Sequence, residues 1–214
     1  MAGLFLTFEG IDGSGKSTQA RLLKDRLEKE GYPTLLVREP GGTALSERVR
    51  EILLDRQLHI VPFAELLLFS AARAQLVEER IRPALQQEQM VIADRFYDST
   101  TAYQGGGRRV ADIPWLRAFN QRVTGGLKPH RTYLIDVPLE VAFQRLSGHI
   151  PDRMESAGKA FYERVRATYH ALAREEPQRF LVLDGREPVS VLHERIWADV
   201  QELLRRYSGT GFHA

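Results

Sequence analysis

The chain has 214 residues, with 30 lysines and arginines against 28 aspartates and glutamates, so its formal net charge is +2 at pH 7. So balanced a charge gives no argument for binding nucleic acid or a membrane, and we expect neither partner. The sequence has no cysteine, which excludes disulfides, thiolate catalysis and cysteine-based zinc sites. Its start lacks the basic segment of a signal peptide, and no apolar run approaches the ~20 residues that span a bilayer, so we expect a cytoplasmic protein.

Five short apolar runs predict the strands of a buried parallel sheet. Each run is nearly continuous in β-branched, leucine or aromatic residues, which is typical of strands that are covered on both faces. Because helical stretches separate the runs, the pattern predicts an α/β fold with right-handed crossovers. The five runs occupy residues 4–9, 34–39, 90–95, 131–137 and 179–185.

Longer amphipathic or apolar stretches between the runs predict helices. Gly31 follows the first stretch and Pro83 the second, and both residues are common helix ends. No linker rich in proline, glycine or serine divides the chain, so we expect one domain over residues 1–207 and a disordered tail at 208–214. The predicted helices occupy residues 16–30, 62–82, 158–175 and 188–206.

The first strand leads into the sequence GIDGSGKS at residues 10–17, the glycine loop, which fits the pattern G-x-x-x-x-G-K-[ST]. A strand before this loop and a helix after it are the context that the motif requires. The glycines let backbone N–H groups converge on phosphate oxygens, so the loop predicts a bound nucleoside triphosphate. Lys16 would reach the β- and γ-phosphates, and Ser17 would bind Mg²⁺. The predicted ATP contacts in this segment are Gly10, Ile11, Asp12, Gly13, Ser14, Gly15, Lys16, Ser17 and Thr18.

The end of the third strand narrows the class of P-loop protein. The chain lacks the Asn-Lys-x-Asp guanine reader of GTPases, and Arg95 follows Asp94 where many ATPases place a water-orienting glutamate. Asp94 is well placed to hold the metal or its waters, and Arg95 to bind a phosphate bidentately. This combination favours transfer to a phosphorylated acceptor. A surface ion pair at the strand end is the alternative interpretation of both residues.

Several segments together resemble one family. They are FEGIDGSGKST (8–18), REPGGT (38–43), AARAQL (71–76), DRFYDSTTAYQGGGR (94–108) and the dipeptide DR at 152–153. They occur in the order and spacing of the bacterial thymidylate kinases, and the resemblance covers residues 3–200. It implies a three-layer P-loop NTPase fold with a five-stranded parallel sheet, flanking helices and a small lid. It also implies a homodimer that transfers the γ-phosphate of ATP to dTMP, with Mg²⁺, to form dTDP.

The resemblance also implies which residues bind the base of the acceptor. Phe69 resembles the ring that stacks on thymine, Arg73 the guanidinium that bonds a base carbonyl, and Thr100 a position near N3 of the base. Phe69 and Arg73 are four residues apart, so they share a helix face. The apolar surroundings of Phe69 fit a core residue equally well. The same helix is apolar nearly all round, which suggests a second buried face against another subunit.

Further acceptor contacts follow from the resemblance. Asp12 matches a carboxylate that faces the sugar and phosphate, although an exposed loop acid is the alternative. Tyr103 resembles an aromatic residue that disfavours a 2′-hydroxyl, with ordinary helix packing as the alternative. Arg38 is expected near the acceptor phosphate, at a strand end where open α/β sheets bind ligands, or in a structural ion pair. Glu39 lies at the same strand end, and Gln104 matches another acceptor position.

The chemistry requires cations rather than a general base. The acceptor phosphate has a second pKa of about 6 and is mostly dianionic at neutral pH, so the obstacle is repulsion between two polyanions. The resemblance implies that an arginine comes either from the phosphate loop or from a mobile lid. Because the glycine loop holds no arginine, we expect a lid at about residues 144–158 to supply it. Arg153 is the first candidate, unless it pairs with a neighbouring carboxylate, and Arg145 is a further ATP contact. The predicted catalytic residues are Lys16, Arg95, Arg153 and Asp12.

Two alternatives remain open at the level of sequence. The first is a kinase of another deoxynucleotide, or of a nucleoside, for which Asp12 or Glu39 would have to act as the base. The second is a non-catalytic ATP-binding module, which would bind ATP and transfer no phosphate. The intact residues Lys16, Ser17, Asp94 and Arg95 argue against this second alternative.

Overall fold

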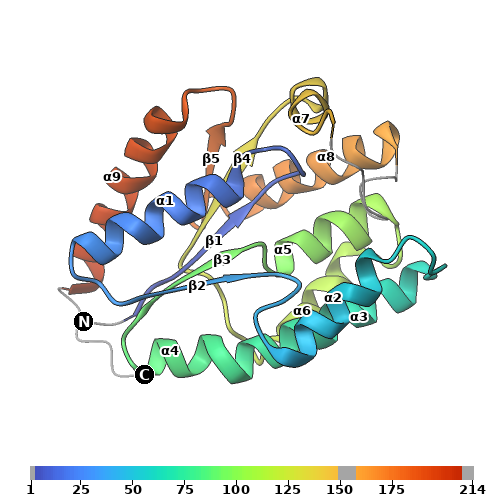
Figure 1. The fold of residues 1–214 in the computed structure, drawn as a ribbon, viewed down its shortest axis with the longest axis horizontal. Helices are drawn as coiled ribbons and strands as arrows, with labels where there is room; N and C mark the ends of the chain where they lie inside the picture. The colour runs from blue at the N-terminus through green and yellow to red at the C-terminus, as the bar shows by residue number, and fades with distance from the viewer. Residues whose placement is uncertain (1–2, 149–157, 209–214) are drawn as a thin grey trace.

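The computed structural model describes residues 3–148 and 158–208. Its parallel strands form one five-stranded sheet in the order β2-β3-β1-β4-β5 (Figure 1). Each strand lies within one of the predicted apolar runs, so the predicted α/β architecture is confirmed. The strands are β1 (Phe5–Glu9), β2 (Thr34–Arg38), β3 (Met90–Asp94), β4 (Arg131–Asp136) and β5 (Phe180–Asp184).

The register of the sheet brings the ends of the first three strands together. Phe8 of β1 lies opposite Asp94 of β3, and Arg38 of β2 also lies opposite Asp94. Because all the strands run in one direction, the segments that follow β1, β2 and β3 leave from the same edge. Ligands of open α/β sheets bind at this carboxyl edge.

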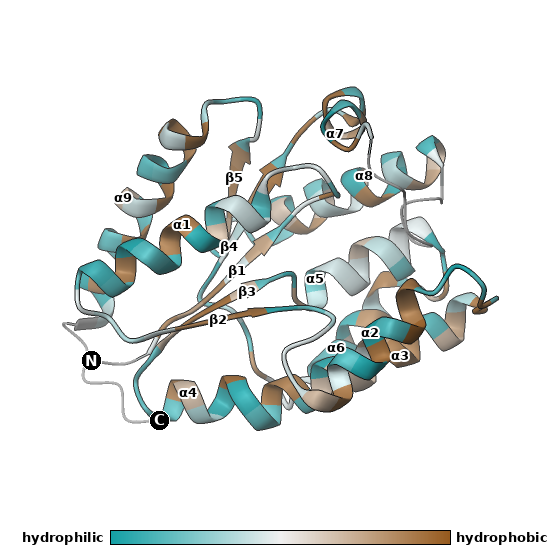
Figure 2. Cartoon of the chain, in the orientation of Figure 1, coloured by the Kyte–Doolittle hydropathy of each residue, from teal (hydrophilic) through white to brown (hydrophobic). Residues whose placement is uncertain are grey.

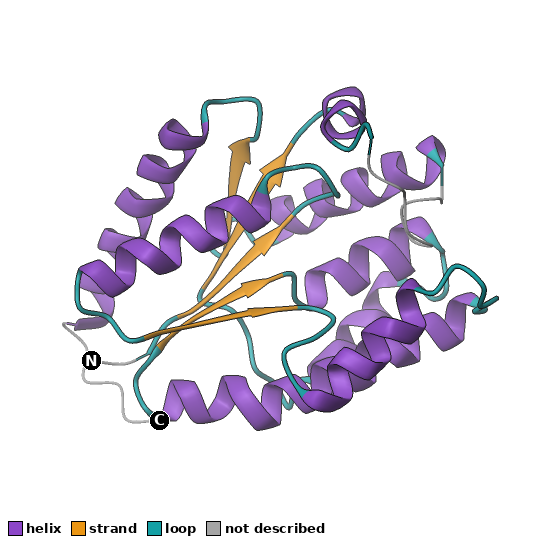
Figure 3. Ribbon diagram, in the orientation of Figure 1, coloured by secondary structure: helices purple, strands orange, loops and turns teal. Residues whose placement is uncertain are grey.

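Helices cover both faces of the sheet, which gives three layers (Figure 3). One face packs against α1 (Lys16–Lys29) and α9 (Val189–Ser208). Successive side chains of a strand point to opposite faces of the sheet, so alternate strand residues face these two helices. The side chains at this interface are apolar and buried. They include Leu6, Phe8, Leu23, Ile92 and Ile196.

The opposite face packs against helical segments that run without interruption from Pro62 to Gln86: α3 (Pro62–Leu76), η1 (Val77–Ile81) and α4 (Arg82–Gln86). The prediction that this helix ends before Pro83 is wrong. The wider turn of η1 comes just before the proline, and Pro83 occupies the first turn of α4, where a missing N–H is tolerated. Much of α3 is hydrophobic (Figure 2).

Two further helical segments complete this layer. α8 (Lys159–Glu175) packs against the continuous pair α5 (Tyr97–Thr100) and η2 (Thr101–Gly107). The α5–η2 pair was not among the predicted elements, nor were three other helices: α2 (Ala44–Leu54), α6 (Ile113–Val123) and α7 (Leu139–Arg145). Two of these have side-chain N-caps, since Thr43 accepts a hydrogen bond from the backbone N–H of Ser46 and Asp112 from that of Trp115.

The predicted lid and tail lie only partly within the described residues. The first two lid positions, residues 144–145, end α7, whereas Arg153 lies outside the described residues. Ser208 is the last residue of α9, and the rest of the predicted tail is not described. The assignment of residues 1–207 to one domain stays a prediction. In the described part of the chain, no helix is both long and apolar enough to cross a bilayer.

Candidate functional site

The glycine loop joins β1 to α1 and packs tightly against the neighbouring backbone. At Gly10, where φ is 142°, an added Cβ would lie 2.5 Å from the carbonyl oxygen of Ile135 in β4. At Gly13, where φ is 77°, an added Cβ would lie 2.6 Å from the carbonyl oxygen of Ala142 in α7. Residues with a side chain are therefore excluded at both positions by conformation and by space.

Lys16 begins α1 and its side chain is buried beside the loop. Its Nζ lies 3.4 Å from the carbonyl oxygen of Ile11 and 3.7 Å from Oδ1 of Asp12. Burial lowers the pKa of Lys16, because a charged ammonium loses hydration there. In the P-loop motif the lysine at this position contacts the phosphates of the nucleotide.

Arg145 connects α7 to the glycine loop and to the end of β5. Its Nη1 donates to the carbonyl oxygens of Gly13 and Ser14, at 3.3 and 3.2 Å. Its Nη2 donates to the carbonyl oxygen of Gly185 at 2.8 Å. The loop carbonyls at these positions thus point to a guanidinium, and Arg145 lies beside the loop where a nucleotide contact was predicted.

Ser17 and Asp94 line one cavity at the carboxyl edge of the sheet, together with Arg38. Oδ1 of Asp94 is buried and lacks a hydrogen-bond partner among the described residues. A carboxylate oxygen and a hydroxyl are ligands that Mg²⁺ accepts, and Mg²⁺ in phosphoryl-transfer sites takes its remaining ligands from phosphates and water. These two residues therefore fit a magnesium ion bound jointly with a nucleotide. We call this space the Asp94 cavity.

A second cavity, the Arg73 cavity, is lined by Asp12 of the glycine loop. It brings together most of the predicted acceptor residues, from four separate segments of the chain. The lining residues that were predicted are Asp12, Glu39, Phe69, Arg73, Arg95, Thr100, Tyr103 and Gln104. The lining residues that the sequence analysis missed are Pro40, Arg50, Leu54 and Ser99.

Asp12 and Arg95 meet at the boundary between the glycine loop and the Arg73 cavity. Nη2 of Arg95 donates to Oδ1 of Asp12 at 2.5 Å, and the hydroxyl of Tyr103 donates to Oδ2 at 3.0 Å. Burial would raise the pKa of Asp12, but the charges of Arg95 and Lys16 outweigh it and hold that pKa well below its usual range. The carboxylate is consequently ionised at neutral pH.

The backbone of Arg95 has a φ of 73°, in the left-handed region that non-glycine residues rarely adopt. Its Nη1 donates to the carbonyl oxygen of Gly10 at 2.9 Å and to Oγ of Ser99 at 3.1 Å. The Tyr103 ring lies 4.9 Å from the guanidinium carbon. A strained backbone and several contacts thus fix a guanidinium at the edge of the cavity.

A buried carboxylate that the sequence analysis missed lies behind Arg95. Oε1 of Glu9 accepts from the backbone N–H of Phe96 at 2.8 Å, and Oε2 accepts from Ser99 Oγ at 2.6 Å and from the Tyr169 hydroxyl at 2.8 Å. Burial, reinforced by the charge of Asp98, raises the pKa of Glu9 to about 7. A glutamate at the end of a mostly apolar, fully buried strand was the signal that could have drawn attention to it.

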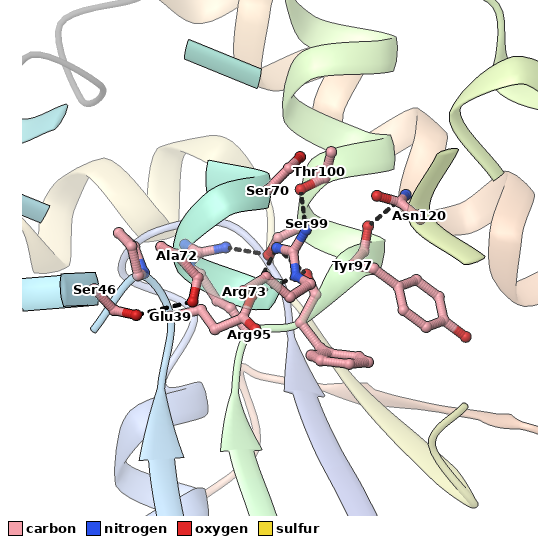
Figure 4. Close-up of polar contacts among 12 residues, drawn as sticks. Glu39, Ser46, Ser70, Ala72, Arg73, Arg95, Tyr97, Ser99, Thr100 and Asn120 are labelled. Carbon is pink, nitrogen blue, oxygen red and sulfur yellow. Dashed lines mark hydrogen bonds and ion pairs between the residues drawn. The ribbon is translucent and has the colours of Figure 1, made fainter. Parts of the chain in front are cut away.

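Arg73 lines the cavity named after it, is only 1% exposed and lies between Glu39 and Thr100 (Figure 4). Its Nε donates to Oε2 of Glu39 at 2.7 Å, its Nη1 to Oγ1 of Thr100 at 2.8 Å, and its Nη2 to the carbonyl oxygen of Phe96 at 3.2 Å. Burial raises the pKa of Glu39, and the charge of Arg73 opposes that rise. The half-buried Phe69 lines the same cavity one helical turn away.

Arg38 lies apart from this group. Its Nη2 donates to Oε2 of Glu47 at 3.0 Å, and its side chain lines the Asp94 cavity rather than the Arg73 cavity. The ion pair that was the alternative interpretation is therefore present, and contact with the acceptor phosphate stays a prediction. Arg50, which was missed because α2 was not predicted, lines the Arg73 cavity and donates to the carbonyl oxygen of Pro40 at 3.1 Å.

Each of the two cavities includes a residue of the glycine loop, Ser17 in the Asp94 cavity and Asp12 in the Arg73 cavity. The Asp94 cavity offers the hydroxyl of Ser17, the residue that follows Lys16, and the carboxylate of Asp94, which suit a metal bound with a nucleotide. The other offers a planar guanidinium beside an aromatic ring, which suits a flat polar ring. The two cavities therefore offer separate sites whose side chains suit a nucleotide with its metal and a second nucleotide.

Comparisons with known proteins agree with this geometry. A family model described as thymidylate kinase matches residues 8–196. The thymidylate kinase of Deinococcus radiodurans is 48% identical over 201 residues, which cover 94% of this chain and 97% of that protein. That of Caldanaerobacter subterraneus subsp. tengcongensis is 46% identical over 205 residues, or 96% and 98% of the two chains. The crystal structure of the Ehrlichia chaffeensis thymidylate kinase matches with a TM-score of 0.77 and 36% identity, over 94% of this chain and 99% of that one.

Proposed function

The chain belongs to the thymidylate kinase family, and we propose that it transfers the γ-phosphate of ATP to dTMP and so forms dTDP. It is an ATP-dependent nucleoside monophosphate kinase with a P-loop NTPase fold. The observation that carries this function is the Arg73 cavity, which joins Phe69 and Arg73 to the Asp12–Arg95 pair at the glycine loop. The family favours this activity over the alternatives left open by the sequence.

The roles of the individual residues belong to the proposal. Backbone amides of the glycine loop and the Lys16 ammonium bind the phosphates of ATP, and Arg95 binds the phosphate of dTMP. Ser17 and Asp94 would hold Mg²⁺, which would supply charge neutralisation for the phosphates. Asp12 stays ionised and keeps Arg95 in place. The dianionic acceptor is itself the nucleophile, so these residues supply position and charge rather than a proton acceptor.

The base of dTMP would lie in the inner part of the Arg73 cavity. Phe69 stacks on the ring, and a remaining N–H of Arg73 bonds a base carbonyl. Tyr103, held by its hydroxyl to Asp12, packs where a 2′-hydroxyl would stand. The catalytic arginine of the lid is Arg153, and Arg145 supports the nucleotide from beside the loop.

Further parts of the proposal concern assembly and location. Large apolar side chains are exposed on α2, α3 and α6, and such surfaces mark protein interfaces. We propose that this face joins two copies of the chain into a homodimer. A chain without cysteine also suits the reducing cytosol, where dTTP synthesis takes place. The exposed residues of this dimer face are Leu45, Ile52, Phe63, Leu67 and Trp115.

An acceptor panel tests the function. Purified protein with Mg·ATP is offered dTMP, dUMP, dCMP, dGMP or thymidine, and ADP release is measured together with the phosphorylated product. We expect dTMP to have the highest kcat/KM. A Lys16→Ala variant serves as the inactive control, with a circular dichroism spectrum that shows it is folded.

Two outcomes would overturn the proposal. Turnover of thymidine in preference to dTMP would identify a nucleoside kinase, and ATP binding without any product would identify a non-catalytic module. Retention of more than about a tenth of the wild-type rate by the Lys16→Ala variant would contradict the role assigned to the lysine.

A further inference from the structure

Glu65, in the first turn of α3, is a buried carboxylate that none of the roles above uses. It is 1% exposed. Its Oε1 accepts from Nε2 of Gln104 at 2.9 Å and from Nε of Arg108 at 3.2 Å, and its Oε2 accepts from Nη2 of Arg108 at 3.3 Å. Both donors follow Thr100 in the chain, so the carboxylate faces the segment that lines the Arg73 cavity.

The carboxylate restricts the orientation of one side chain of that cavity. A carboxylate paired with a guanidinium can only accept hydrogen bonds. The amide nitrogen of Gln104 must therefore face Glu65, and the amide oxygen must face away from it. Among the described residues no donor reaches that oxygen, and Gln104 lines the Arg73 cavity. Gln104 thus offers its amide oxygen to the cavity as a hydrogen-bond acceptor.

A donor lies on the same wall. Arg73 bonds Thr100 at 2.8 Å, and Thr100 is four residues before Gln104 in the continuous helical segment. A guanidinium has five N–H groups and no acceptor, so any ligand atom that meets Arg73 must accept. The wall therefore combines one acceptor, from Gln104, with one donor, from Arg73.

This combination distinguishes two classes of pyrimidine. Thymine and uracil place N3–H between two carbonyl oxygens, so they give a donor to Gln104 and an acceptor to Arg73. Cytosine has a lone pair at N3 and an amino group at C4, and it would set acceptor against acceptor and donor against donor. Sites built around a buried hydrogen bond reject such mismatches strongly, because a polar group is left unpaired.

We propose that Glu65 is a positioning residue that fixes the orientation of the Gln104 amide. In this way Glu65 sets the preference for bases with an N3–H over cytosine, an inference that rests on the proposed function. It touches no substrate itself. When Glu65 is replaced by glutamine, the new amide can donate as well as accept. The Gln104 amide is then free to turn over and offer an N–H to the N3 lone pair of cytosine.

The test compares binding of dTMP and dCMP to wild-type protein and to the Glu65→Gln variant by isothermal titration calorimetry. We expect the ratio of Kd for dCMP to Kd for dTMP to fall by about tenfold or more in the variant, the size of one mismatched hydrogen bond. The KM for ATP should stay unchanged, since Glu65 lies on the side of the Arg73 cavity. If the role of Glu65 were merely structural, the variant would bind both nucleotides more weakly by the same factor, and the ratio of the two Kd values would not change.

Asp199→Asn is the matched control. Asp199 accepts from Nε and Nη2 of Arg131 at 2.9 and 2.8 Å and from the Tyr133 hydroxyl at 2.9 Å, in a network that does not line the Arg73 cavity. It should lose stability and keep the wild-type ratio. If Glu65→Gln does not fold, Glu65→Asp keeps the charge but withdraws it from Gln104, and a smaller fall in the ratio is expected.

The outcomes separate this inference from the proposed function. An unaltered ratio in the folded variant would overturn the role of Glu65, as would wild-type protein that binds dCMP as tightly as dTMP. The binding ratio decides this role whether or not the protein turns dTMP over. Formation of dTDP, in contrast, decides the proposed function alone.

Discussion

Nε of Arg73 donates to Oε2 of Glu39 over 2.7 Å, and both side chains are buried. The two residues come from different layers, since Arg73 belongs to α3 and Glu39 follows β2. Removing one member of such a pair leaves the other charge buried without compensation, which is strongly destabilising. The pair therefore links the stability of the fold to the geometry of the cavity.

Glu39→Gln should lower the free energy of unfolding by about 3 kcal/mol, because the Arg73 charge loses its buried partner. The KM for dTMP should also rise by at least about tenfold, while the KM for ATP changes little, since Arg73 faces only the acceptor cavity. Urea denaturation and initial rates measure the two effects. Glu78→Gln is the control, since it removes an exposed pair with Arg82 that is worth less than about 1 kcal/mol. Equal effects of the two variants would contradict the prediction.

Arg153→Ala should lower kcat by about a thousandfold with little change in the KM for dTMP, as expected for a cation that contacts the transferring group. Arg145→Ala should act differently, because its guanidinium is held by the carbonyl oxygens of Gly13 and Ser14. Its main effect should be a higher KM for ATP. Rapid-quench measurement of the chemical step distinguishes the two. A thousandfold loss of kcat in Arg145→Ala, with Arg153→Ala near wild type, would exchange the two roles.

The buried Glu9 should give the stability a dependence on pH. Burial raises its pKa to about 7, above the unfolded value, so the folded protein holds a proton between about pH 4.5 and 7 that the unfolded chain has released. The contribution of Glu9 is therefore fully present below about pH 4.5 and is lost as the pH rises through about 7. Between about pH 5 and 8, we expect this to lower the free energy of unfolding by on the order of 2 kcal/mol.

Glu9→Gln isolates this contribution, because the amide does not titrate. Burial lowers the pKa of His130, so that residue acts in the opposite direction and costs stability as the pH falls. It is present in both proteins and cancels in their difference. Urea denaturation across the pH range gives that difference directly. If the wild-type and variant curves run parallel, Glu9 does not titrate in this range.

Leu67→Glu should convert a homodimer into monomers, because it places a charge in the proposed dimer face. Light scattering after gel filtration should give about twice the chain mass of 24.4 kDa for the wild type and the single mass for the variant. Val191→Glu is the matched control, since Val191 on α9 and Leu67 are both 45% exposed. A wild-type monomer, or a dimer that survives Leu67→Glu and yields to Val191→Glu, would contradict this choice of face.

The strands and the glycine loop were predictable from sequence because their signals are local. A strand buried on both faces reads as a continuous apolar run, and the loop is a fixed spacing of glycines and lysine between a strand and a helix. The helix through Pro83 was misjudged at its end because the wider turn of η1 has no clear sequence signal. The short helices α2 and α6 were missed although Thr43 and Asp112 are recognisable caps.

The site was predictable only where spacing or family resemblance pointed to it. Phe69 and Arg73 share a face because they are one helical turn apart. The buried carboxylates Glu9 and Glu65 were missed, because their partners lie in distant segments: Tyr169 reaches Glu9 from α8, and Gln104 reaches Glu65 from η2. Such contacts depend on tertiary packing, and one sequence carries no local mark of them.

The tight packing of Gly10 and Gly13 against β4 and α7 has an evolutionary consequence. Any added methyl group would collide with a neighbouring backbone carbonyl before it met a nucleotide. Selection for folding alone would then preserve both glycines in a descendant that had lost its catalytic activity. If a lineage keeps these two glycines, that is therefore weaker evidence for enzymatic activity than if it keeps Lys16 or Arg95. No steric constraint of the fold requires a lysine or an arginine at those two positions.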